Sequence, residues 1–71
     1  MTLLINANAL AKFNGSEFNF VDSNNKSADF DNLNDNVTYT LRDGETVVQD
    51  NMTKASVVNT INNEFGANTN I

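Results

Sequence analysis

The sequence contains no cysteine, no histidine and no proline among its 71 residues. The lack of cysteine excludes disulfides and thiolate zinc sites, on which small domains commonly depend for stability. With neither histidine nor cysteine, the residues that most often serve as general base and nucleophile in covalent catalysis are missing. The sequence therefore argues against an enzyme, and it favours association with another chain as a source of stability.

Basic residues are also scarce, because four Lys and Arg residues stand against nine Asp and Glu, for a net charge of −5. A surface of this charge repels phosphate backbones and anionic lipid headgroups, so neither direct nucleic-acid binding nor membrane binding is expected. No apolar run approaches the roughly 20 residues of a spanning helix. The lack of cysteine fits several compartments, so localisation stays open between a cytoplasmic protein and a component of a virus particle.

The beginning of the chain alternates between apolar and other residues. From Leu3 to Phe13 every odd position is Leu, Ile, Ala or Phe, which is the period of a half-buried strand. Asn14-Gly15 has the composition of a type I′ turn, and a second alternating run follows at Glu17–Val21. The pattern predicts a β-hairpin over about residues 3–21.

A helix over Ala7–Phe13 is the alternative for the same segment, because Ala and Leu are good helix formers. Asn6 would cap this helix and Asn14-Gly15 would end it. The hairpin is preferred because Asn14-Gly15 suits a type I′ turn and an alternating run follows it. Its register also pairs Lys12 with Glu17, two opposite charges, across the strands.

A second hairpin is predicted over about residues 37–49. Val37–Arg42 and Glu45–Gln49 are rich in β-branched residues and flank Asp43-Gly44, a strong two-residue turn signal. This register aligns Arg42 with Glu45.

The period then changes to that of a helix, since Val57, Val58, Ile61 and Phe65 follow helical spacing. Asn51 or Thr53 is available as the N-cap and Gly66 as the stop, which predicts a helix near residues 52–65 and a polar tail at 67–71. The expected fold class is α+β in a single domain, residues 1–71. It consists of a small antiparallel sheet of two β-hairpins, in the order β-β-β-β-α, with the C-terminal helix packed on one face.

Between the hairpins lies a polar segment, residues 22–36, whose many Asn and Asp residues are typical of a connecting loop. Phe30 and Leu33 stand three residues apart within it, which indicates either one helical turn fixed to the core or apolar groups offered to a partner. The candidate partner-binding residues are these two and the neighbouring carboxylates, namely Phe30, Leu33, Asp29, Asp31 and Asp35.

The same loop is the best place for a metal ion, because Asp22, Asn24 and the three candidate aspartates carry the hard oxygen ligands that calcium prefers. Their spacing does not match a calcium-binding loop, since Leu33 occupies a ligand position and Asn34 replaces the turn glycine. No metal, no cofactor and no catalytic residue is therefore predicted.

The expected function is that of a non-catalytic structural or protein-interaction subunit, such as a minor component of a virus particle or of another homo-oligomeric assembly. Association would use sheet edges and the polar loop, with a second copy or a different protein as the partner. The alternative is a small acidic regulator or inhibitor that binds a host protein, such as a nucleic-acid enzyme, through the loop around Phe30.

Overall fold

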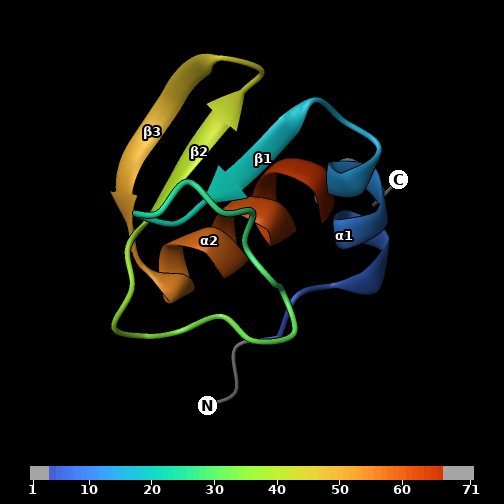
Figure 1. The fold of residues 1–71 in the computed structure, drawn as a ribbon. Coiled ribbons are helices and arrows are strands. Elements are labelled where there is room, and N and C mark those ends of the chain that lie inside the picture. Colours follow the sequence, from blue (N-terminus) through green and yellow to red (C-terminus); the bar gives the residue numbers. More distant parts are fainter. Residues whose placement is uncertain (1–3, 67–71) are drawn as a thin grey trace.

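The computed structural model describes residues 4–66, which form an α+β fold with an N-terminal helix, a three-stranded antiparallel sheet and a C-terminal helix (Figure 1). The elements in chain order are α1 (Ala7–Asn14), β1 (Phe18–Val21), β2 (Tyr39–Asp43), β3 (Thr46–Met52), α2 (Lys54–Ile61) and the π-helical turn η1 (Asn62–Gly66). The expected four-stranded sheet is wrong, because a helix occupies the place of the first predicted strand. The start of that strand at Leu3 and the predicted tail at 67–71 lie outside the described residues.

The sequence pattern at the N-terminus fits both a strand and a helix. Ile5, Ala9 and Phe13 are odd positions, as a strand requires, but they are also four residues apart, as one face of a helix requires. In the structure Ala9 and Phe13 are buried, whereas the intervening Ala7 and Ala11 are exposed. The buried positions of this segment therefore follow the period of a helix and not that of a strand.

Local hydrogen bonds complete α1 at both ends. The Asn6 side-chain oxygen accepts from the backbone N–H groups of Asn8 and Ala9, at 2.9 and 3.2 Å, which satisfies donors that the first turn leaves without partners. Gly15 has a φ of −84° and its N–H donates to the carbonyls of Ala11 and Lys12. Because a type I′ turn needs a positive φ, Asn14-Gly15 ends a helix and forms no hairpin.

The sheet has the order β1-β2-β3, with β2 in the middle. The first and second strands pair from Phe18 with Asp43 to Val21 with Thr40. Phe20 lies opposite Leu41, and both are buried on the face that meets the helices. The strand that the sequence predicted at Glu17–Val21 is thus present, but its partner is β2 and not the N-terminal segment.

The second hairpin forms, with its turn one residue later than predicted. Asp43 pairs with Thr46, so the two turn residues are Gly44 and Glu45. Gly44 has a φ of 60°, while Glu45 does not have a positive φ, which is the pattern of a type II′ turn. As a result Arg42 pairs with Val47, and not with Glu45.

The C-terminal helical segment begins at the Thr53 cap, whose side-chain oxygen accepts from Ser56 N–H at 3.2 Å. Val57, Val58 and Ile61 form its buried face. The segment then continues as η1, where a Cβ at Gly66 would lie 3.3 Å from the Ala9 Cβ. This close approach places the C-terminal segment directly against α1.

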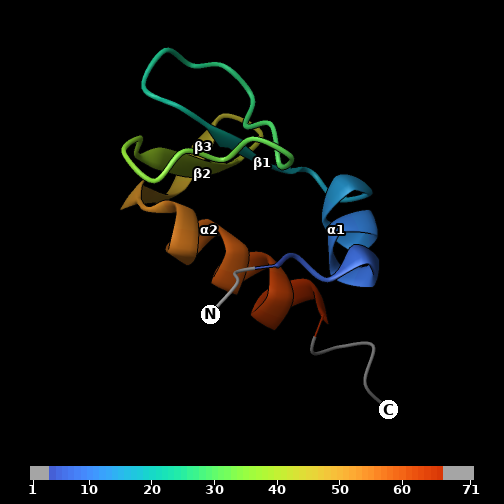
Figure 2. The same ribbon diagram turned by 90° about the horizontal axis from the view of Figure 1, so that it is seen from below.

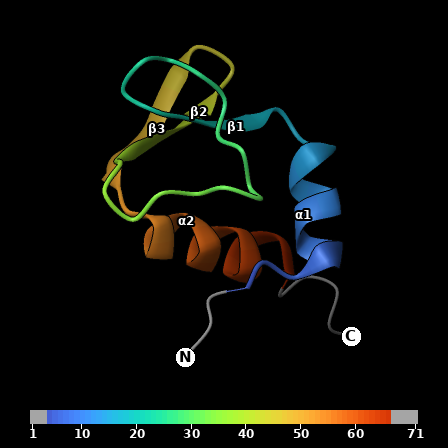
Figure 3. The ribbon, with the colours of Figure 1, turned by 60° about the horizontal axis from the view of Figure 1, so that its bottom comes forward.

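The core lies between the sheet, α1 and α2. Its buried residues are Ala9, Phe13, Phe20, Tyr39, Leu41, Met52, Val57 and Ile61. Figure 2 and Figure 3 show α2 crossing one face of the sheet with α1 beside it. The open side of the molecule is the outer edge of β3, which no helix covers in any of these views.

Candidate protein-interaction surfaces

The loop residues singled out from the sequence divide into two groups. Phe30 and Leu33 are partly buried and pack against the core, and the Phe30 ring meets Phe13 and Phe20 edge-on at centroid distances of 5.6 and 6.3 Å. Asp29, Asp31 and Asp35 are exposed. The two apolar residues therefore fix the loop to the core.

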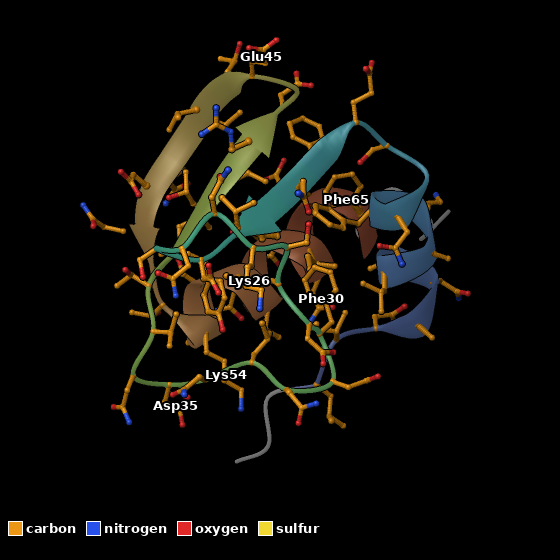
Figure 4. The ribbon with its side chains drawn as sticks, in the orientation of Figure 1. Lys26, Phe30, Asp35, Glu45, Lys54 and Phe65 are labelled. Carbon is orange, nitrogen blue, oxygen red and sulfur yellow. The ribbon has the colours of Figure 1, made fainter. Side chains whose placement is uncertain are left out.

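Three of these five residues line one hollow of about 340 Å³, which we call the loop hollow. Its walls come from the segment before α1, the polar loop and the start of α2. The lining residues are Leu4, Ile5, Phe30, Asp31, Leu33, Lys54 and Val58. Figure 4 shows Lys54 near the bottom of the molecule and Phe30 above it, close to mid-height. Asp29 and Asp35 do not line it.

Asp29 has a local structural role. Its carboxylate accepts hydrogen bonds from the Asn32 side chain at 3.1 Å and from the Asp31 backbone N–H at 3.0 Å. These two bonds, that of Asn32 first, hold the pKa of Asp29 below its ordinary value, because they favour the charged form. Such a carboxylate stabilises the turn that positions Phe30.

Asp22, one of the calcium ligands considered from the sequence, instead accepts hydrogen bonds from the main chain of its own loop. The Asp22 carboxylate accepts from the backbone N–H groups of Asn24 and Lys26, at 2.9 and 3.0 Å. Among residues 4–66, no three His, Cys, Asp or Glu side chains gather as a group able to hold a metal ion. Within the same range no helix has the length and apolarity to cross a membrane.

A second surface, which the sequence reasoning did not single out, runs along β3. All residues of this strand from Thr46 to Asn51 are exposed, and Val47 and Val48 each keep 51% of their surface exposed. Two adjacent apolar residues in a strand point to opposite faces of the sheet. That adjacency is the signal in the sequence that at least one of them lies outside the core.

Beside Val48 the sheet and the C-terminal segment enclose a hollow of about 330 Å³, which we call the sheet hollow. It is lined by Phe18, Leu41, Val48, Gln49, Thr60, Glu64 and Phe65. Phe65 forms its inner wall, with its ring edge-on to Phe13 at 5.3 Å and to Phe18 at 5.9 Å. The sheet hollow thus lies between the apolar core and the exposed strand β3.

The two edges of the sheet differ. At the outer edge of β1 the loop returns, because Ser27 bridges to Val21 and the Ala28 N–H donates to the Phe20 carbonyl at 2.8 Å. No comparable segment of residues 4–66 pairs with the outer edge of β3. Every second residue of an edge strand directs its N–H and C=O away from the sheet, so β3 keeps open hydrogen-bonding positions.

No charged side chain among residues 4–66 is buried. Comparisons with protein-family models, with curated proteins and with solved structures gave no match. The functional interpretation therefore depends on the geometry of the β3 edge and the two hollows.

Proposed function

We propose that this protein is a non-catalytic protein-interaction subunit that joins another polypeptide through the open edge of β3. The observation that carries the proposal is the exposed Val47-Val48 pair on an edge strand that lies next to the sheet hollow. An added strand would gain main-chain hydrogen bonds from the edge and apolar contact from the valines.

The contrast between the two edges supports this choice. Proteins commonly protect an edge by covering it, by bulges or by charge. The loop covers β1, whereas β3 has bulges but no covering strand among residues 4–66. One register shift of the β2–β3 pair lies between Leu41 and Arg42, whose partners are Gln49 and Val47. Val48 is therefore the extra residue of a β-bulge, and a second shift follows between Tyr39 and Leu41. The pairs next to the turn, Asp43 with Thr46 and Arg42 with Val47, are regular, so an added strand would meet a regular edge at Thr46 and Val47 and a bulge at Val48.

A single lysine placed in this stretch tests the proposal. Val48→Lys puts a charge at the edge and at the mouth of the sheet hollow, while Asn59→Lys adds the same charge to an exposed position of α2 that lines neither hollow. We expect the wild-type chain and Asn59→Lys to form the same complex, with itself or with a second protein from the cells that make it, and Val48→Lys to lose it.

Sedimentation velocity and affinity capture from those cells provide the measurements. The proposal is wrong if all three chains sediment as monomers and recover the same set of proteins. Far-UV circular dichroism of each variant establishes that the comparison is between folded chains.

The loop hollow supports a second candidate function, the acidic inhibitor. Leu4 beside it is 72% exposed, and Phe30, Asp31 and Leu33 present apolar and acidic groups together. Leu4→Lys tests this alternative, because its side chain contributes little to the core. Loss of a captured protein by Leu4→Lys, with retention by Val48→Lys, would favour the loop hollow over the β3 edge.

A further inference from the structure

Resting on the proposed function, we infer that the segment bound at the β3 edge is an extended, basic stretch of a different protein. It lies along Thr46–Gln49 as a fourth antiparallel strand, pairs at Thr46 and Val47, and places one apolar side chain beside Val48, the bulged residue at the mouth of the sheet hollow. Alternate side chains of an added strand point to the same face, so this apolar residue is flanked by Lys or Arg residues on the other face.

Charge around the edge specifies the basic character of the partner. Asp43 and Glu45 lie at the turn, Asp50 lies further along β3, and all three are exposed. Glu17 is also near the turn, since its carbonyl accepts from the Gly44 N–H at 3.4 Å. Carboxylates thus flank the pairing stretch at both ends, which favours a segment of opposite charge.

Positive groups are few at this end of the molecule. The Arg42 guanidinium donates to the Glu45 carbonyl at 3.0 Å and so belongs to the hairpin itself. The lysines lie on other elements, with Lys12 on α1, Lys26 in the polar loop and Lys54 at the start of α2. Figure 4 shows Glu45 at the top of the hairpin, Lys26 near the middle of the view and Lys54 near the bottom.

The same charges disfavour a second copy of the chain as the occupant. In an antiparallel pair of β3 strands centred near Val47 and Val48, Glu45 of each copy falls within one residue of Asp50 of the other. Like charges that face each other across strands are destabilising, and each copy also carries a net charge of −5. A basic segment gives attraction at both of these positions.

The sheet hollow accounts for the apolar residue of the segment. Its mouth lies beside Val48, and Leu41, Phe18 and Phe65 supply apolar walls. A branched aliphatic side chain on the added strand would cover Val48, which is 51% exposed, and would enter this space. The main-chain pairing of the added strand and the burial of its apolar side chain would then both occur beside Val48.

Short synthetic peptides test the inference directly. The probe is a blocked eight-residue peptide in which Lys and Val alternate, and the controls are a Glu-Val peptide and a Lys-Val peptide with a central proline that cannot pair as a strand. Titration against the full chain is followed by NMR. We expect amide shifts and slowed exchange along Thr46–Gln49, and binding of the Lys-Val peptide at least tenfold tighter than that of either control.

Protein variants and salt complete the test. Val48→Lys is expected to weaken binding of the Lys-Val peptide about tenfold, Asn59→Lys to leave it unchanged, and added salt to weaken it further. Equal binding of the Glu-Val peptide, or shifts confined to the loop hollow, would overturn the inference.

The remaining outcomes separate this inference from the proposed function. If the Lys-Val peptide does not bind but the chain self-associates or captures a non-basic protein in a manner sensitive to Val48→Lys, the inference fails and the proposed function stands. If neither the peptide nor any protein binds at β3, both fail.

Discussion

At the scale of single residues, side-chain amides and hydroxyls hold the main chain where the apolar core does not reach. The Asn6 side chain caps α1, and its backbone N–H donates to the Asn62 side chain at 2.7 Å. The Asn62 amide in turn donates to the Leu4 carbonyl at 2.9 Å. These bonds connect the two ends of the described chain, so polar residues that look like loop formers in the sequence have fixed structural roles.

The cap on α1 gives the first prediction. Asn6→Ala removes the acceptor of two backbone N–H groups, so we expect the free energy of unfolding to fall by about 1 kcal/mol. Asn8→Ala is the matched control, because Asn8 is exposed and lies within the helix, where Ala is the better helix former. Urea denaturation measures both. Equal loss in the two variants would contradict the role of Asn6 as the cap.

The second residue-scale prediction concerns pH. The Asp50 carboxylate accepts from the Thr40 hydroxyl at 2.6 Å and from the Asn51 N–H at 2.8 Å, and these bonds, that of Thr40 first, lower the pKa of Asp50 below its ordinary 3.8. Because the folded-state pKa is the lower one, the stabilisation is present above about pH 4 and is lost as pH falls through the folded value.

Thr40→Val removes the hydroxyl donor and tests this assignment. We expect the pKa of Asp50 to rise toward its ordinary value and the acid-induced loss of stability to become smaller. Carbon-detected NMR titration of the carboxyl group gives the pKa directly, and Thr38→Val, at an exposed neighbour, is the control. An unchanged Asp50 titration would show that the Thr40 bond does not form in solution.

At the scale of elements, the two glycines that follow Asn14 and Asp43 have different roles. Gly15 has a φ of −84° at the end of α1, whereas Gly44 has a φ of 60° in the β2–β3 turn. Only the second conformation disfavours other residues. The Asn-Gly and Asp-Gly pairs look alike in the sequence, but only the Asp-Gly pair lies at a strand reversal.

Substitution by alanine distinguishes the two positions. A Cβ at Gly44 meets no atom within 4 Å, so the cost of Gly44→Ala comes from its positive φ and is expected to be about 1 kcal/mol. At Gly15 the nearest atoms lie 3.6 Å away, in ordinary contact. Gly15→Ala is expected to leave stability unchanged or to raise it by about 0.5 kcal/mol. The reverse order in urea denaturation would contradict both backbone assignments.

At the scale of the whole molecule, charge and the open edge act against each other. The proposed association would use the exposed β3 edge, while the net charge of −5 makes copies of the chain repel each other at neutral pH. The sequence pI of about 4.1 marks the pH near which this repulsion disappears. Self-association should therefore become stronger as the pH falls toward the pI, because the repulsion between copies weakens.

The corresponding prediction is that the pure chain is a monomer at pH 7 and associates as the pH approaches 4. Val48→Lys should reduce this association more than Asn59→Lys, although both add one positive charge. Sedimentation velocity at several pH values measures the effect, with circular dichroism to establish that the chain remains folded. Stable dimers at pH 7, or equal behaviour of the two variants, would contradict the opposing roles of charge and edge.

The candidate interaction surfaces could be predicted only in part. Phe30 and Leu33 stand out in the sequence as apolar residues in a polar loop, and with the candidate carboxylate Asp31 they line a common hollow. The sheet hollow could not be foreseen, because its walls come from β1, β2, β3 and the C-terminal segment, which only folding brings together. The open β3 edge depended on knowing that the N-terminal segment forms no strand.

The sequence by itself determined the elements whose signals are local. The strand near Phe18, the hairpin around Gly44 and the helix ending near Gly66 follow from alternation, turn residues and helical spacing. The segment around Ala9 and Phe13 was decided by tertiary structure, because its apolar spacing fits both a strand and a helix. Burial of Ala9 against Gly66 and of Phe13 among the aromatic rings of Phe20, Phe30 and Phe65 favours the helix, and these contacts join residues far apart in the chain.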